Sequence, residues 1–159
     1  MLQAYAASPK LSEDFDVICF GGGGFTADEI NQFSGLGISG KRIHQLAGDD
    51  TVLAEHYRAA SVFIYPSLYE GFGIPPLEAM SFDCPVVCSN VSSIPEVVGN
   101  AAEMFNPYEV DAIRLAIERV VTDDRLRQTL IERGRERIKV FSWERCARET
   151  LDVYRKVSP

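Results

Sequence analysis

Five short apolar runs alternate with helix-like segments along the first two-thirds of the chain, and this alternation constrains the fold more than any other feature. The runs are rich in β-branched and aromatic residues and are bounded by Gly, Pro, Asp or Asn, which is typical of β-strands. They lie at 16–20, 43–46, 62–66, 85–89 and 102–105. Near-continuous apolar strands separated by helices indicate a parallel sheet covered on both faces. We therefore predict an α/β fold with a doubly wound parallel sheet.

The segments between these runs, and the whole chain after residue 107, have helical character. Helices are predicted at 26–37, 50–60, 75–82, 110–123, 124–141 and 142–157. The apolar residues of the later segments recur at helical spacing, with Ile113, Ile117 and Val120 on one face. We expect the C-terminal helices to pack on the sheet, so that residues 1–159 form a single domain.

The beginning of the chain departs from this pattern. A doubly wound sheet normally begins with a strand that becomes central, but residues 2–15 resemble the end of a helix that leads into the run at 16–20. We expect the first strand to be absent, with its slot between the strands at 16–20 and 62–66. Unpaired strand edges attract partners, so we predict oligomerisation, strand exchange or a rearranged sheet.

Composition narrows the function classes. The chain has 159 residues, 46% of them hydrophobic, with 16 Lys and Arg against 23 Asp and Glu. This acidic balance provides no overall field that would attract a nucleic acid. No apolar stretch approaches the roughly 20 residues that span a bilayer, and the first residues lack the features of a signal peptide. We expect a soluble, intracellular protein whose four scattered cysteines serve packing rather than metal binding or disulfides.

A run of four glycines follows the first strand and precedes a helix. Gly22, Gly24 and Ala27 satisfy G-x-G-x-x-A, and Asp49 lies near the place where a dinucleotide site needs a ribose-binding acid. A tight strand-to-helix connection explains the glycines at least as well. Asp49 is then better interpreted as the N-cap of the next helix, and His44, inside a strand, as a structural residue.

A second candidate site, "YEGFGIPPLEAM", follows the run at 62–66. Glu70 lies in a loop at the carboxyl end of a strand, and Glu78 lies in the first turn of a helix or just beyond it. Helix N-termini at this edge of an open α/β sheet present N–H groups to anions, and carboxylates accept hydrogen bonds from sugar hydroxyls. A nucleotide sugar would suit this arrangement. An ordinary helix start, in which both glutamates only complement local backbone and the helix dipole, is about equally compatible with the spacing.

The sequence from residue 56 to 107, and again from 123 to 157, closely resembles the C-terminal, donor-binding domain of retaining glycosyltransferases with the GT-B fold. These are the group 1, or family 4, enzymes, and Glu70 and Glu78 match their E-x7-E motif. The resemblance extends over the chain from about residue 16. It implies a Rossmann-like donor domain, the C-terminal half of a GT-B fold.

The resemblance also assigns roles to individual residues. Glu70 would be the catalytic-site glutamate beside the transferred sugar, and Glu78 would hold the ribose hydroxyls. Loop backbone would contact the sugar and the pyrophosphate, the glycines after the first strand would line the cleft, and the loop after the second strand would hold the base. The loop backbone is that of Gly71, Phe72, Gly73 and Ile74, and the glycines that line the cleft are Gly22 and Gly23. The loop that holds the base contains Leu46, Ala47 and Gly48. Ser92 and Ser93 belong to the neighbouring strand-end loop.

As the resemblance implies, the reaction is transfer of a sugar from a nucleoside diphosphate to an acceptor hydroxyl with retention of configuration and without a metal or other cofactor. The acceptor would be a saccharide, a lipid-linked molecule or a small molecule, held by an N-terminal domain that is absent from this chain. The full-length enzyme would be cytoplasmic, in some cases at the cytoplasmic face of a membrane.

The family's Arg and Lys that neutralise the pyrophosphate have no counterpart before the first strand, where Lys10 is the only basic residue. Each lost charge-assisted hydrogen bond is typically worth about 1.5–3 kcal/mol. We therefore expect weak nucleotide binding and no transfer activity by this chain alone. Two alternatives remain at this stage: an NAD(P)-binding oxidoreductase fragment, and a non-catalytic partner-binding module.

Overall fold

Five parallel strands form the centre of the computed structural model, which describes residues 1–157. The strands are β1 (Val17–Phe20), β2 (Ile43–Leu46), β3 (Phe63–Tyr65), β4 (Val86–Ser89) and β5 (Ala102–Phe105). Every pairing is parallel: β1 with β2, β3 with β4, and β4 with β5. All five predicted strands are confirmed, with ends that differ by no more than one residue from the predicted runs.

The sheet is divided at the place that the sequence predicted. Within residues 1–157, β1 and β2 form one sheet and β3, β4 and β5 form another, so β1 and β3 each pair with a single neighbour. The expectation that β1 and β3 would each have an unpaired edge is therefore confirmed, and a missing strand between them stays a prediction. A parallel edge strand of this kind leaves backbone N–H and C=O groups available for pairing.

Nine helices connect and cover the strands in the described part of the chain. They are α1 (Leu2–Ala6), α2 (Pro9–Asp14), α3 (Ala27–Gly35), α4 (Asp50–Ala59), α5 (Ile74–Ser81), α6 (Ile94–Val98), α7 (Val110–Thr122), α8 (Asp124–Ile138) and α9 (Trp143–Val157). The segment before β1 is split because Ser8 caps α2 and Pro9 starts it. The short helix α6 was not foreseen in the sequence.

The strands are covered on both faces, as a doubly wound sheet requires. On β4, Val87 packs in one apolar cluster with residues of α1, α2, α3 and α7, whereas Val86 and Cys88 pack in a second cluster with residues of α4, α5 and α6. All three side chains are fully buried. Because successive side chains of a strand point to opposite faces, β4 places the sheet between two helical layers.

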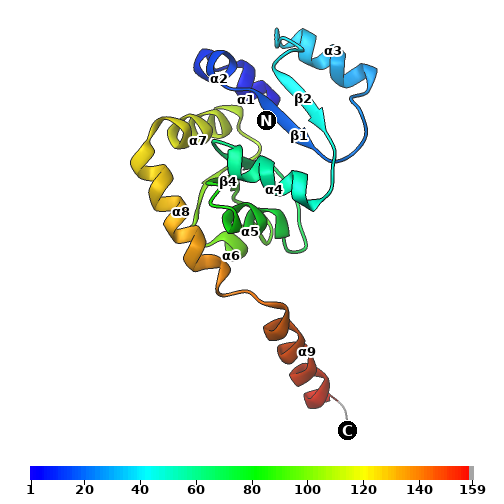
Figure 1. Cartoon of the computed structure of the whole chain (residues 1–159), viewed down its shortest axis with the longest axis vertical. Helices are drawn as coiled ribbons and strands as arrows, with labels where there is room; N and C mark the ends of the chain where they lie inside the picture. The colour runs from blue at the N-terminus through cyan, green and yellow to red at the C-terminus, as the bar shows by residue number, and fades with distance from the viewer. Residues whose placement is uncertain (158–159) are drawn as a thin grey trace.

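The C-terminal helices behave differently from one another. Helices α7 and α8 pack against the body, and Gly134 of α8 allows a close approach to Met80 of α5. Helix α9 has no buried residue, and Figure 1 shows that it extends away from the rest of the chain. The expectation that all the C-terminal helices pack on the sheet is therefore wrong for α9. No helix in residues 1–157 combines the length and the apolar character needed to cross a membrane.

Candidate functional site at the carboxyl ends of the strands

The loop between β3 and α5 carries the acidic motif. Gly73 is the N-cap of α5 and has a left-handed backbone with φ 98° and ψ 66°. Ile74 begins the helix, and Pro75 and Pro76 follow it. Proline is well suited to the first turn of a helix because its fixed φ matches the helix and its missing N–H would have had no partner there. Local sequence therefore determines where the loop turns and where α5 starts.

Four consecutive backbone N–H groups of this loop are free. Gly71, Phe72, Gly73 and Ile74 donate no hydrogen bond to any acceptor in residues 1–157. They lie at the positive end of the α5 dipole, where unpaired N–H groups favour negative charge. The predicted loop before the start of a helix is confirmed, with Gly73 as the N-cap and Ile74 as the first residue of α5. Gly71, Phe72 and Ile74 are exposed and Gly73 is buried.

The Glu70 carboxylate is held on one oxygen. Its Oε1 accepts hydrogen bonds from Tyr65 Oη at 2.6 Å and from Ser67 Oγ at 2.8 Å. These two donors, that of Tyr65 first, lower the pKa of Glu70 below its ordinary value. The pKa of Tyr65 is raised, by burial and then by its bond to the carboxylate. Glu70 is therefore ionised at neutral pH and fixed in orientation.

Two serines of the loop between β4 and α6 hold the backbone of the Glu70 loop. Ser92 Oγ accepts a hydrogen bond from the Glu70 N–H at 3.3 Å and donates to the Glu70 carbonyl at 2.8 Å. Ser93 Oγ is within 2.9 Å of both the Glu70 and Phe72 carbonyls. Ser92 has a positive φ of 57°, which is uncommon for a residue other than Gly and is often found at functional sites.

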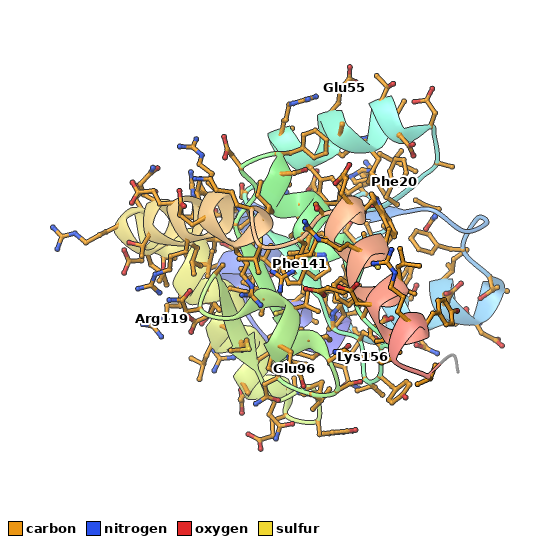
Figure 2. The ribbon with its side chains drawn as sticks, turned by 90° about the horizontal axis from the view of Figure 1, so that it is seen from below. Phe20, Glu55, Glu96, Arg119, Phe141 and Lys156 are labelled. Atoms are coloured by element: carbon orange, nitrogen blue, oxygen red, sulfur yellow. The ribbon has the colours of Figure 1, made fainter. Side chains whose placement is uncertain are left out.

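A further contact reaches the loop from the end of α8. The rings of Phe72 and Phe141 meet edge to face, with centroids 5.6 Å apart. The Arg137 guanidinium lies 4.9 Å from the centroid of the Phe141 ring and donates hydrogen bonds to the carbonyls of Glu96 and Val97 in α6. Figure 2 shows Phe141 near the centre of the view, where the chain passes from α8 to α9. The connection to α9 therefore touches the loop.

Glu78 lies in the second turn of α5, just beyond the first turn, and is exposed. Its carboxylate makes no hydrogen bond or ion pair with any residue from 1 to 157. The pKa of Tyr57 is raised to about 12, chiefly by burial and then by the nearby charge of Glu78. An exposed carboxylate without an intramolecular partner is available to accept hydrogen bonds from ligand hydroxyls.

The other predicted positions lie at the carboxyl ends of β1 and β2. The Gly21 N–H donates to the Leu46 carbonyl at 2.9 Å, so the glycine loop with Gly22 and Gly23 begins beside the end of β2. Ala47 and Gly48 follow Leu46 and are exposed. A Cβ at Gly48 would lie 2.7 Å from Val52 Cβ, so glycine is needed here for packing against α4.

Asp49 has a structural role. Its Oδ1 accepts hydrogen bonds from the N–H groups of Thr51 at 3.0 Å and Val52 at 3.1 Å, so it is the N-cap of α4. This confirms the interpretation that the sequence favoured. His44 lies within β2, where its Nε2 is 3.4 Å from Asp16 Oδ2.

The predicted residues form two groups. Glu70, Gly71, Phe72, Gly73, Ile74 and Glu78 belong to one short segment, which bonds to the β4–α6 loop; Gly22, Gly23, Leu46, Ala47 and Gly48 lie together on the other sheet. No hydrogen bond, ion pair or aromatic contact within residues 1–157 joins the two groups. Sequence reasoning missed Tyr65 and Ser67 as partners of Glu70. The only signal was their polar hydroxyls at the end of an otherwise apolar strand.

Comparisons with known proteins agree with this architecture. The sequence profile of the glycosyl transferases group 1 family matches residues 1–137. This chain belongs to that family. It is 42% identical over 157 residues to the O-antigen chain mannosyltransferase B of Escherichia coli, an alignment that covers 98% of this chain and 41% of that protein. The chain therefore spans less than half the length of that relative.

Solved structures place the chain within the same fold. Sucrose-phosphate synthase from Thermosynechococcus elongatus has a TM-score of 0.79 at 27% identity, covering 98% of this chain and 42% of that one. Anabaena HepE, in a complex with UDP, has a TM-score of 0.80 at 19% identity, covering 98% and 44%. The fold is the Rossmann-like C-terminal half of a GT-B glycosyltransferase, and the dinucleotide oxidoreductase alternative is not favoured.

Proposed function

We propose that this chain is the donor-binding domain of a retaining glycosyltransferase that moves a sugar from a nucleoside diphosphate to an acceptor hydroxyl. The observation that carries the proposal is the segment from Glu70 to Glu78. It combines an oriented carboxylate with four N–H groups at a helix start and a second carboxylate, neither of which has a hydrogen-bond partner among residues 1–157. Because the relative from Escherichia coli is named a mannosyltransferase, a mannosyl donor is the first to test.

Each part of a nucleotide sugar has a matching group in this proposal. Glu70 accepts hydrogen bonds from the transferred sugar, and the N–H groups of Gly71, Phe72, Gly73 and Ile74 bind the diphosphate. Glu78 holds the ribose hydroxyls. The loops of the other sheet complete the cleft, with Gly22 and Gly23 near the diphosphate and Leu46, Ala47 and Gly48 at the base. The family membership supports this order along the donor.

The chemistry proposed for this domain is electrostatic. As the bond between the sugar and the diphosphate breaks, negative charge develops on the leaving diphosphate, and fixed N–H donors aimed at that charge stabilise the transition state. We propose that neither a metal nor another cofactor takes part. Asp49, which the sequence offered as the ribose-binding acid of a dinucleotide site, caps α4 instead and accepts two backbone N–H groups on Oδ1.

The remaining parts of the reaction are proposed to lie in a longer polypeptide. An N-terminal domain would hold the acceptor, which is a saccharide, a lipid-linked molecule or a small molecule, and no nucleic acid takes part. Lys10, the one basic residue before β1, lies in α2 and pairs with Asp14 at 3.0 Å, and we propose that it does not replace the pyrophosphate-binding cations of the family. Residues 1–159 would thus bind nucleotides weakly and transfer no sugar. A cytoplasmic location, at a membrane face where the acceptor is lipid-linked, fits a nucleotide-sugar donor.

The divided sheet supports a proposal about association. β1 and β3 each have one pairing partner within residues 1–157, and such edges pair readily with another strand. We propose that the isolated chain forms oligomers through these edges. Sedimentation velocity over a range of protein concentrations tests this, because a monomer at every concentration would contradict it.

A thermal-shift assay with free nucleotides tests the donor site. We expect UDP, GDP or ADP at millimolar concentration to raise the midpoint of unfolding, and Glu78→Ala to abolish this protection. Glu55→Ala is the control, because Glu55 is an exposed glutamate of α4, far from Phe141 in Figure 2. Protection by NAD(P) instead would favour the oxidoreductase alternative, and protection by no nucleotide would favour a partner-binding module.

A further inference from the structure

The two oxygens of the Glu70 carboxylate are not equivalent. Oε1 accepts both hydrogen bonds, from Tyr65 and Ser67, and Oε2 accepts none from residues 1–157. A carboxylate that is free to rotate exchanges its two oxygens, but two donors on one oxygen fix the plane of the group. One oxygen is thereby committed to the protein, and the other remains open to a ligand.

Tyr65 is itself held in place by the core. Its ring stacks on that of Phe63, with centroids 5.9 Å apart and planes 27° apart, and it packs against the cluster between β4 and α5. Tyr65 Cε1 lies 3.8 Å from the position that a Cβ on Gly73 would take. Tyr65 therefore lies beside the loop, and its hydroxyl approaches Glu70 from a fixed position.

Ser67 is a less committed donor than Tyr65. Its Oγ lies 2.8 Å from Glu70 Oε1 and 3.2 Å from the Tyr69 carbonyl. A serine hydroxyl has one hydrogen, so these two acceptors compete for it. The bond from Tyr65 is also the shorter one, in the range of a charge-assisted O–H···O⁻ bond.

The backbone and the side chain of Glu70 are controlled by different groups. The hydroxyls of Ser92 and Ser93 bond only to backbone atoms of the loop, whereas the Tyr65 hydroxyl bonds only to the Glu70 carboxylate. Removing the Tyr65 hydroxyl therefore releases the carboxylate and leaves the anchors of the loop intact. The free N–H groups of Gly71 to Ile74 do not depend on that hydroxyl.

We propose that Tyr65 is a positioning residue that directs Oε2 of Glu70 toward a hydroxyl of the donor sugar, and so makes the site prefer a nucleotide sugar over the bare nucleoside diphosphate. The role rests on the proposed function of the same site. Tyr65 touches no part of the donor in this arrangement. It acts on the sugar through Glu70, while diphosphate binding depends on the loop backbone.

The test compares Tyr65→Phe with Tyr5→Phe in the full 159-residue chain. Tyr5 is a matched control because its hydroxyl also donates one short hydrogen bond, to the Phe15 carbonyl at 2.7 Å, at a place remote from the loop. Two readouts are needed. Carboxyl-carbon NMR follows the titration of Glu70, assigned with Glu70→Gln, and calorimetry measures the affinities of GDP-mannose and UDP-glucose beside those of GDP and UDP.

In Tyr65→Phe we expect the titration midpoint of Glu70 to rise and the affinity for the nucleotide sugar to fall roughly tenfold, the effect of losing about one good hydrogen bond. The affinity for the free diphosphate should stay unchanged, and Tyr5→Phe should change neither readout. An unchanged Glu70 midpoint, or an equal loss for sugar nucleotide and diphosphate, would overturn the positioning role.

The two proposals can fail separately. If the unaltered chain binds no nucleotide, the proposed function fails and the sugar preference fails with it, whatever the NMR titration shows. If the chain binds diphosphates but Tyr65→Phe leaves the preference for the sugar form intact, only the positioning role is refuted.

Discussion

Gly73→Ala is the substitution for which the structure makes the sharpest prediction. Gly73 is buried, caps α5 and has φ 98° and ψ 66°. A Cβ at this position would lie 3.8 Å from Tyr65 Cε1 and 3.9 Å from Ile94 Cγ1, which are ordinary van der Waals distances. There is room for the methyl group, so any cost of the substitution arises in the backbone.

The size of that cost follows from the conformation. An L-residue in a left-handed conformation costs about 1–2 kcal/mol, and sparsely populated regions cost up to about 3 kcal/mol. Alanine also restricts the unfolded chain, which stabilises the folded state by about 0.4–1 kcal/mol. The net prediction is a loss of about 1–2 kcal/mol in the free energy of unfolding. If the loop relaxes to avoid the strain, its N–H groups move and nucleotide binding weakens as well.

Urea unfolding followed by circular dichroism measures this difference, provided that the slope of the free energy against urea is unchanged. Gly71→Ala is the matched control in the same loop, because Gly71 is exposed, lacks a positive φ and has open space at its Cβ position. We expect that control to be close to neutral. Equal effects of the two substitutions, or a neutral Gly73→Ala, would refute the argument from backbone conformation.

Two further predictions concern contacts around the site. Phe141→Ala removes the edge-to-face contact with Phe72 and the ring beneath the Arg137 guanidinium. We expect urea unfolding to show a loss of about 1–2 kcal/mol in the free energy of unfolding, and nucleotides to protect the variant less. A variant that nucleotides protect as well as the wild type would contradict the link between Phe141 and the loop. Hydrogen bonds from Arg135 at 2.7 and 2.8 Å lower the pKa of Asp83. The stability that this pair contributes is complete above the ordinary aspartate pKa near 4 and is lost as pH falls through the lower pKa of Asp83 in the folded chain. Arg135→Gln should therefore make the free energy of unfolding less sensitive to acid below about pH 4. An unchanged dependence of that free energy on pH would count against the role of this pair.

The fold could be predicted largely from the sequence because its strands carry strong local signals. β-branched and aromatic residues bounded by turn formers define runs such as 16–20, 62–66 and 85–89, and parallel pairing follows from the helices between the strands. The short helix α6 has too few residues to show a periodic pattern. The position of α9 was wrongly expected because an amphipathic pattern shows that a helix has an apolar face and does not say what covers it.

The candidate site was predictable in its backbone and less so in its side chains. The location of Glu70 and Glu78 follows from a strand, a turn and two prolines, which are all local features. The bond from Tyr65 depends on the direction in which the loop returns after Ser67, and sequence spacing does not determine that direction. The bonds from the β4–α6 loop depend on β4 lying beside β3.

The arrangement of the loops has a consequence for how the site depends on the rest of the chain. The Glu70 loop is fixed by neighbours within its own part of the molecule: hydrogen bonds from Ser92 and Ser93, and the ring of Phe141. Among the links between the loops at β1 and β2 and that part is a shared apolar cluster, in which Ile43 and Val87 both lie. Apolar packing is less directional than hydrogen bonding. A substitution in that cluster should therefore change the distance between the Glu70 loop and the loops at β1 and β2 more than it changes the geometry within either group of loops. In the proposed donor site, substitutions in the cluster would then affect the fit of the whole nucleotide, whereas loss of the Tyr65 hydroxyl, which bonds to the Glu70 carboxylate, would affect the sugar alone.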